Sequence, residues 1–171
     1  MTSADDLGRV VIPKEIRRTM RIREGDPLEI YTDAGGEVIF KKYSPIGELS
    51  TFASQYADAL TGATQLAIVI CDRDHCVAAA GLPKREVLER RNSMALEEIM
   101  QSRRFFTANG EAVTALDGVN REICVAAPII SSGDVTGAVV LLSTESARTP
   151  TDTDIKLVQV AAGFLGKQME E

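Results

Sequence analysis

The chain has 171 residues, enough for one large domain or two small ones. Its apolar and charged fractions, 44% and 26%, are typical of a soluble globular protein, and no apolar run approaches the roughly 20 residues that span a bilayer. Three cysteines, an odd number, favour reduced thiols in the cytoplasm over a disulfide framework. We therefore expect a cytoplasmic protein without a membrane partner.

The net charge of −6 is unevenly distributed. Residues 1–45 contain eight basic and eight acidic residues, a balance of zero, whereas residues 46–171 contain eleven and seventeen, a balance of −6. Like charges at helical spacing repel by about 0.2–0.5 kcal/mol per pair, so a basic cluster in the first part indicates a surface for an anionic partner. Its six cations are Arg9, Lys14, Arg17, Arg18, Arg21 and Arg23.

The first 45 residues have the pattern of a small β-rich unit. The β-branched run Val10–Ile12 predicts a short strand, and Pro13 suits the first position of a helix over Lys14–Met20. Ile16 and Met20, four positions apart, are expected on the buried face of that helix. Gly25 and Asp26 mark a turn, and residues 33–36 are expected to join two hairpin strands, Leu28–Thr32 and Glu37–Lys41.

A unit of this size buries too little surface to be stable alone. A disulfide set is not available, and we see no metal site to hold it together. Self-association is the remaining way to stabilise it.

This segment resembles the AbrB family of bacterial transition-state regulators. The matching stretches are Leu7–Pro13, Glu15–Arg18, Ile22, Gly25–Asp26, Leu28–Ile30 and Val38–Tyr43. The resemblance implies an AbrB-type swapped-hairpin barrel, formed by a homodimer whose hairpins interleave. Its continuation into a second domain implies a DNA-binding regulator of sporulation genes.

The resemblance also implies which residues contact double-stranded DNA. Matched by motif, these are Arg9, Arg17 and Arg18; Lys14, Arg21 and Arg23 are further candidates on charge and placement alone. Arginine suits phosphate and guanine because its planar fork donates two parallel hydrogen bonds.

The start of the chain departs from the family. Relatives usually have a further strand before the Leu7–Gly8 turn, where this chain has only residues 1–4. We interpret this as a misplaced start, and the alternative is a lost barrel strand that impairs DNA binding.

Two helices are expected to flank the second part of the chain. Ser44 and Thr151 are their candidate N-caps, and apolar residues recur at spacings of three and four in both. They are Ile46, Leu49, Ala53, Tyr56 and Leu60 in the first, and Ile155, Val158, Ala162, Leu165 and Met169 in the second. These helices either lie against their own sheet or pair with a second subunit.

Between them the pattern predicts an antiparallel α+β sheet. The expected strands are Leu66–Cys71, Cys76–Ala80, Ile123–Ile130 and Val135–Leu142, and the expected helices are Lys84–Arg91 and Met94–Gln101, with Ser93 as a cap. Residues Ala127–Ile129, Gly133 and Gly137–Val140 resemble the late strands of GAF domains, which commonly bind small molecules. We expect an AbrB-like domain (1–45), a linker helix (46–61) and a GAF-like domain with a C-terminal oligomerisation helix (62–171).

Neither catalysis nor metal binding is favoured. His75 is expected at an exposed hairpin tip and the cysteines in the core. A metal set of Cys71, His75, Cys76 and Cys124 has irregular spacing and alternating strand directions. We expect no enzyme activity and no cofactor.

Three functions remain in view. The first is a DNA-binding transcriptional regulator that assembles as a dimer or tetramer, tuned by an unknown small effector of the GAF-like domain. The second is an antitoxin-like interaction module, and the third is a ligand sensor with impaired DNA binding.

Overall fold

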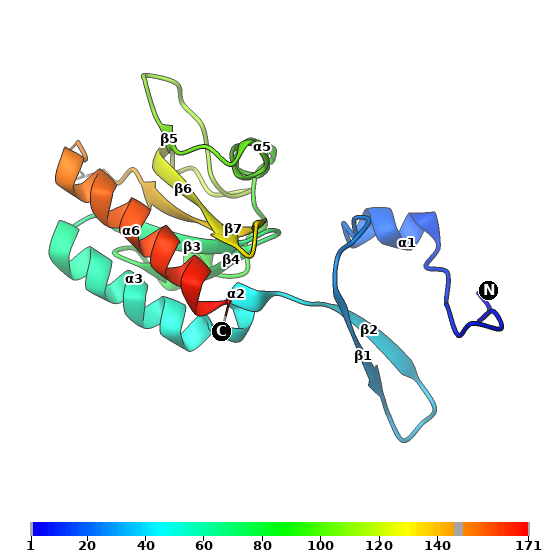
Figure 1. Ribbon diagram of the computed structural model, residues 1–171. Coiled ribbons are helices and arrows are strands. Elements are labelled where there is room, and N and C mark those ends of the chain that lie inside the picture. Colours follow the sequence, from blue (N-terminus) through cyan, green and yellow to red (C-terminus); the bar gives the residue numbers. More distant parts are fainter. Residues whose placement is uncertain (1, 146–148, 171) are drawn as a thin grey trace. The chain divides into compact units, whose positions relative to one another are not determined.

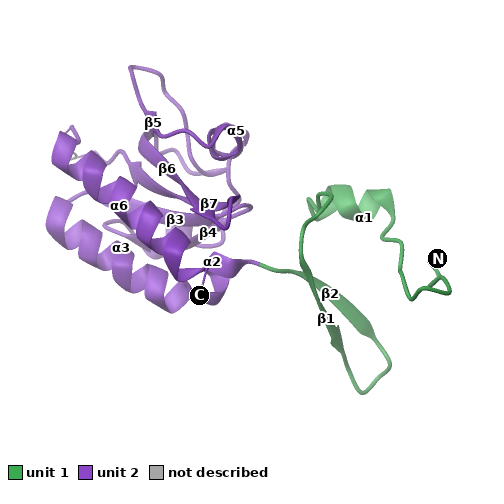
Figure 2. Cartoon of the chain, in the orientation of Figure 1, with its two compact units in different colours: residues 1–43 green, residues 44–171 purple. Residues whose placement is uncertain are grey.

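The computed structural model describes residues 2–145 and 149–170. The chain divides into two compact units, residues 1–43 (unit 1) and residues 44–171 (unit 2), which Figure 2 colours separately. The helix that the sequence suggested as a linker, over residues 46–61, falls within unit 2.

Unit 1 contains one short helix and one hairpin. Helix α1 spans Lys14–Thr19, and strands β1 (Leu28–Thr32) and β2 (Val38–Lys42) pair antiparallel. The predicted hairpin is confirmed to within one residue. The predicted strand Val10–Ile12 is wrong for the single chain, because this stretch pairs only through an isolated bridge between Ala4 and Val10.

The apolar side of α1 is not buried in the single chain, contrary to expectation. Ile16 is 47% exposed and Met20 39% exposed, and no residue of the helix is buried. The physical reason is that no described element of unit 1 packs closely over this side of the helix.

Unit 2 is built on an antiparallel sheet of five strands in the order β4-β3-β7-β6-β5. The predicted strands are confirmed, and the sequence missed β5, which has two residues. The strands are β3 (Ala67–Asp72), β4 (Cys76–Ala80), β5 (Phe106–Thr107), β6 (Ile123–Ser131) and β7 (Asp134–Leu142).

Helices cover both faces of this sheet (Figure 1). One face packs against α2 (Pro45–Glu48), α3 (Ser50–Thr64) and α6 (Asp152–Gln168), and the other against α4 (Lys84–Val87) and α5 (Met94–Ser102). Of the two alternatives for the flanking helices, the structure shows packing against their own sheet. No helix in the described part of the chain is both long enough and apolar enough to cross a bilayer.

The predicted caps form. The Ser44 hydroxyl accepts from Gly47 N at 3.0 Å, the Ser93 hydroxyl accepts from Leu96 N at 3.0 Å, and Thr151 forms a reciprocal capping box with Asp154.

Two helices differ from the sequence prediction. The helix predicted to begin after Ser44 is interrupted at Leu49, which separates α2 from α3. The predicted helix Lys84–Arg91 ends at Val87. Its last residues instead pair with strand β4, because Glu89 N donates to the Cys76 carbonyl and the Arg90 carbonyl accepts from Cys76 N. Pairing with strand β4 thus replaces the last helical turn.

Helix α6 offers a direct test of its packing. A Cβ at Gly166 would lie 2.2 Å from the Ile130 carbonyl oxygen, whereas a Cβ at Gly163 would meet nothing within 4 Å. We expect Gly166→Ala to destabilise unit 2 by about 1–3 kcal/mol through overpacking, and Gly163→Ala to stabilise it by up to about 1 kcal/mol through helix propensity. Urea denaturation measures both, and equal effects would contradict the close approach of α6 to β6.

Candidate nucleic-acid interface

Both ends of the short helix α1 are defined by its sequence and its hydrogen bonds. Pro13 occupies the N-cap position, one residue earlier than predicted. At the other end, Ile22 N donates to the Arg17 carbonyl at 2.8 Å and Arg21 N to the Arg18 carbonyl at 3.2 Å. These two bonds make a Schellman motif, so the helix stops after six residues.

The Schellman motif places Arg21 in the left-handed region, with φ of 54°. Glycine is the usual residue there, because a Cβ costs about 1–2 kcal/mol in this conformation. Arg21 therefore occupies this position at an energetic cost.

A turn made by Asp5 fixes the backbone of Arg9. One carboxylate oxygen of Asp5 accepts from Leu7 N at 3.0 Å and from Arg9 N at 2.9 Å. Gly8 lies between these donors with φ of 77°, which favours glycine.

Arg9 also forms an ion pair with Asp5. Its Nε lies 2.7 Å from the other Asp5 oxygen, and its side chain is 73% exposed. Hydrogen bonds from the Arg9 backbone N–H and then from its guanidinium lower the pKa of Asp5 below 3.8. Since a guanidinium has five donors, Arg9 keeps N–H groups for another acceptor.

The six candidate cations separate by exposure. Lys14, Arg17 and Arg18 are exposed, and the described residues include no carboxylate in ion-pair contact with them. Arg21 and Arg23 are half-buried, and Arg23 N is held by Asp26 Oδ2 at 2.8 Å. The exposed set can therefore offer guanidinium and ammonium donors without first breaking an internal ion pair.

His75 does not lie at an exposed tip, which corrects the sequence prediction. Its Nδ1 lies 3.3 Å from Asp72 Oδ1 and its Nε2 lies 3.3 Å from Glu89 Oε2. Asp72 is buried and also accepts from Asp74 N, His75 N and the Ser44 hydroxyl. The cluster holds the β3–β4 turn together, and Glu89 reaches it because α4 ends early.

The cysteines do not gather with His75 into a metal set. Cys71 and Cys76 face each other across β3 and β4 on the α4–α5 side of the sheet. Cys124 packs against the core on the opposite side. In the described chain, no three His, Cys, Asp or Glu side chains are placed to hold a metal ion. A hydrogen bond between the Cys71 and Cys76 thiols, together with burial, raises the pKa of the Cys71 thiol, which makes it a poor nucleophile.

Comparison with known proteins decides the family. The model of the stage V sporulation protein T C-terminal, transcription factor, matches residues 48–170. Stage V sporulation protein T of Bacillus subtilis is 48% identical over 98% of this chain and 94% of that protein. The chain belongs to the stage V sporulation protein T family. It is accordingly a transcription factor.

The two units have separate relatives. The model of MazE, a bacterial antitoxin, matches residues 2–47, and the transition state regulatory protein AbrB of B. subtilis is 61% identical over 24% of this chain and 42% of its own length. A GAF domain from a Coxiella burnetii phosphoenolpyruvate-protein phosphotransferase aligns with a TM-score of 0.55, covering 71% of this chain and 82% of that one. At 17% identity this likeness shows the fold alone. The predicted AbrB-type and GAF-like folds are confirmed.

The Asp5 turn predicts a pH response. Because the folded-state pKa of Asp5 is depressed, its stabilisation of the turn is present above the unfolded-state pKa and is lost as pH falls through the lower folded value. We expect the carboxyl to titrate below 3.8 in an NMR titration, and Arg9→Ala to raise its pKa part of the way back. An Asp5 pKa unchanged by Arg9→Ala would contradict the ion pair.

Proposed function

We propose that this transcription factor binds double-stranded DNA in the cytoplasm through Arg9, Arg17 and Arg18 of unit 1, in the regulation of sporulation genes. The observation that carries the proposal is the exposure of these side chains on a turn and a helix whose backbones are fixed by capping and by Asp5. Lys14, Arg21 and Arg23 are secondary contacts, since two of them are half-buried.

We also propose that unit 1 functions as a dimer. Cross-strand pairs of β1 and β2 place Ile30 opposite Phe40 and Thr32 opposite Val38, so one face of the hairpin is largely apolar. Ile30 is 64% exposed and Val38 58% exposed. An isolated two-stranded hairpin is at best marginally stable in water, so a second copy of this hairpin is the natural cover.

The dimer places six candidate arginines on one assembly. If all six contact phosphate, the logarithm of the binding constant should fall against the logarithm of salt with a slope of about −5. We expect Arg17→Ala/Arg18→Ala to lower the slope to about −2 and to weaken binding strongly at low salt. A gel shift over a salt series on sheared genomic DNA measures this.

The control is Arg103→Ala/Arg104→Ala, which removes two adjacent, exposed arginines from unit 2. It should bind DNA as the wild type does. Equal losses in both variants would show a general charge effect and reject the assignment to α1.

The apolar hairpin face is tested by Ile30→Glu. We expect the added carboxylate to weaken self-association of unit 1 by about a hundredfold or more, because it would be buried without a partner, and DNA binding should fall with it. Sedimentation velocity and gel shifts measure the two effects. Gln101→Glu, an exposed position on α5, is the charge-matched control, and full-size assembly by Ile30→Glu would contradict the dimer.

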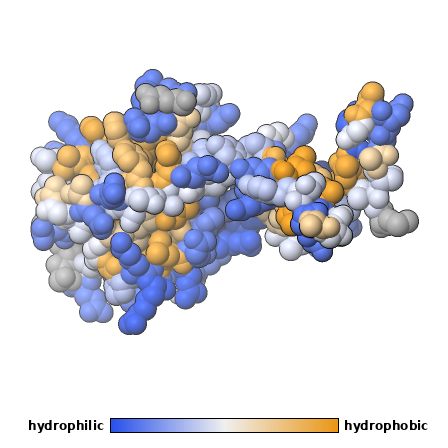
Figure 3. Space-filling view, turned by 90° about the horizontal axis from the view of Figure 1, so that it is seen from below, coloured by the Kyte–Doolittle hydropathy of each residue, from blue (hydrophilic) through white to orange (hydrophobic). Residues whose placement is uncertain are grey.

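We further propose that the helices of unit 2 form a second contact between chains, which extends the assembly from a dimer to a tetramer. On α6, Val160 is 62% exposed and Phe164 41% exposed, and the Phe164 ring stacks on Tyr56 of α3 with centroids 5.6 Å apart. Figure 3 shows exposed apolar surface on both units. A tetramer uses both surfaces, and Val160→Glu would leave a dimer.

An antitoxin role is the second candidate, because the MazE model matches residues 2–47. A DNA-binding failure together with neutralisation of a toxin encoded beside this gene would favour it. The third candidate is a ligand sensor without DNA binding. It predicts that the gel shift shows no DNA binding and that no toxin is neutralised.

A further inference from the structure

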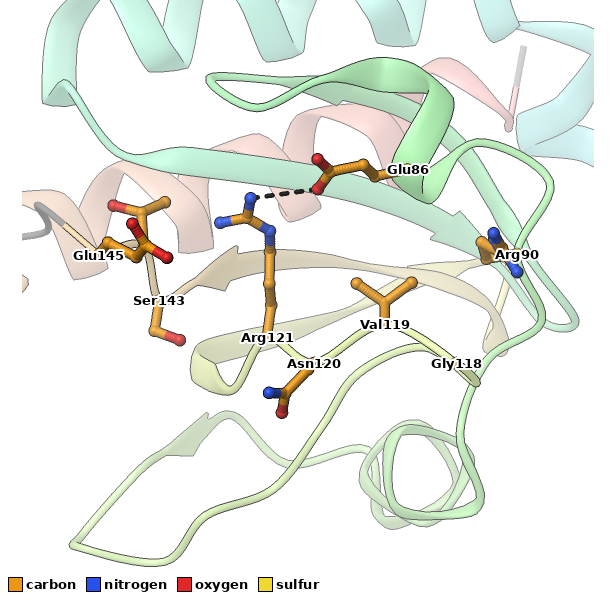
Figure 4. A pocket seen from close by; sticks show the side chains of 9 residues that line it. Glu86, Arg90, Gly118, Val119, Asn120, Arg121, Ser143 and Glu145 are labelled. Carbon is orange, nitrogen blue, oxygen red and sulfur yellow. Dashed lines mark hydrogen bonds and ion pairs between the residues drawn. The ribbon is translucent and has the colours of Figure 1, made fainter.

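Unit 2 contains a cavity of about 520 Å³ at the end of the sheet where β7 leaves and β6 begins. This volume lies within the range of about 300–1,000 Å³ that is usual for small-molecule sites. The walls are the end of α4, the loop of residues 118–121 and the segment 143–145 that follows β7 (Figure 4).

The cavity is lined by donors from three separate segments. Arg90 follows α4, Asn120 and Arg121 lie on the loop before β6, and Ser143 and Thr144 follow β7. Figure 4 shows Arg121 in the middle of the site and Arg90 at one end. Guanidinium, amide and hydroxyl groups are the donors that recognise a carboxylate or a phosphate.

Arg90 and Arg121 differ in their ion pairing and in their exposure to solvent. Arg121 Nη2 lies 3.1 Å from Glu86 Oε2, and the Arg121 side chain is only 23% exposed. Arg90 is exposed, and in the described chain its guanidinium has no ion pair. Because one ion pair uses only part of a guanidinium's five donors, Arg121 can hold Glu86 and a ligand together. Glu86 then acts to orient Arg121.

Glu145 limits what the cavity accepts. Its carboxylate lines the end of the cavity opposite Arg90 in Figure 4, and it repels a second negative group placed there. Val119 lies between these ends and offers apolar contact. The lining therefore favours an organic anion with its charge toward Arg90 and its uncharged part toward Val119.

We propose that this cavity binds a small organic anion, a carboxylate or a phosphate ester, and that it is the effector site of unit 2. Arg90 holds the anionic group. Arg121, Asn120 and Thr144 donate hydrogen bonds to the uncharged part of the ligand, and Glu86 fixes the orientation of Arg121. The site lies wholly within unit 2 and does not depend on DNA binding by unit 1.

The test is isothermal titration calorimetry on the full chain. The probes are succinate for carboxylates and glycerol 3-phosphate and AMP for phosphate esters, with glycerol as the uncharged comparison. We expect saturable binding of at least one anionic probe with a dissociation constant of about 1 mM or tighter, and none of glycerol. Which probe binds distinguishes the two sources of the anionic group.

Variants then locate the binding. Arg90→Ala, which leaves the Arg121–Glu86 ion pair in place, and Arg121→Ala should each weaken binding by about tenfold or more. Glu145→Gln should tighten it. Arg103→Ala/Arg104→Ala and Arg17→Ala/Arg18→Ala should leave it unchanged, the latter even where DNA binding is lost.

Three results would overturn the proposal. These are no saturable binding of any anionic probe, equal binding by wild type and Arg90→Ala, or loss of binding only in Arg17→Ala/Arg18→Ala. The last result would assign the anion to the surface of unit 1.

Discussion

Unit 1 leaves on its surface the apolar side chains that a folded domain has to bury. Leu7, Val11, Ile30 and Val38 are each more than half exposed, and with about 43 residues the unit is close to the size at which chains seldom fold alone. In the proposed dimer, a second copy covers the hairpin that follows the turn around Arg9 and helix α1. In that dimer, the association that stabilises the fold therefore also positions the arginines.

Unit 2 meets the same requirement within one chain. Every residue of β3 is buried, because helices cover both faces of the central strands. This explains why β3 appears in the sequence as a continuous apolar run rather than an alternating one. A self-sufficient core leaves polar groups at the sheet's end free to line the cavity around Arg121.

Buried polar contacts shape unit 2 as much as its apolar cores do. Asp72 collects donors from the β3–β4 turn and from Ser44, and Asn92 Nδ2 donates to the Asp72 carbonyl at 2.8 Å. Since unsatisfied buried polar groups are costly, these bonds select one conformation for the segment after α4. The same segment brings Arg90 to the cavity and Glu89 to His75.

The sequence by itself determined the features that depend on neighbours a few residues apart. The strands of unit 2, the caps at Ser44, Ser93 and Thr151, the hairpin of unit 1 and the basic segment all follow from local periodicity, turn chemistry and charge. Tertiary structure alone decided the early end of α4, the paired setting of His75, the exposure of Ile16 and the separation of Cys124 from Cys71. Each of these depends on which strand lies beside which and on what covers each face, and contacts between residues far apart in the chain leave no local pattern.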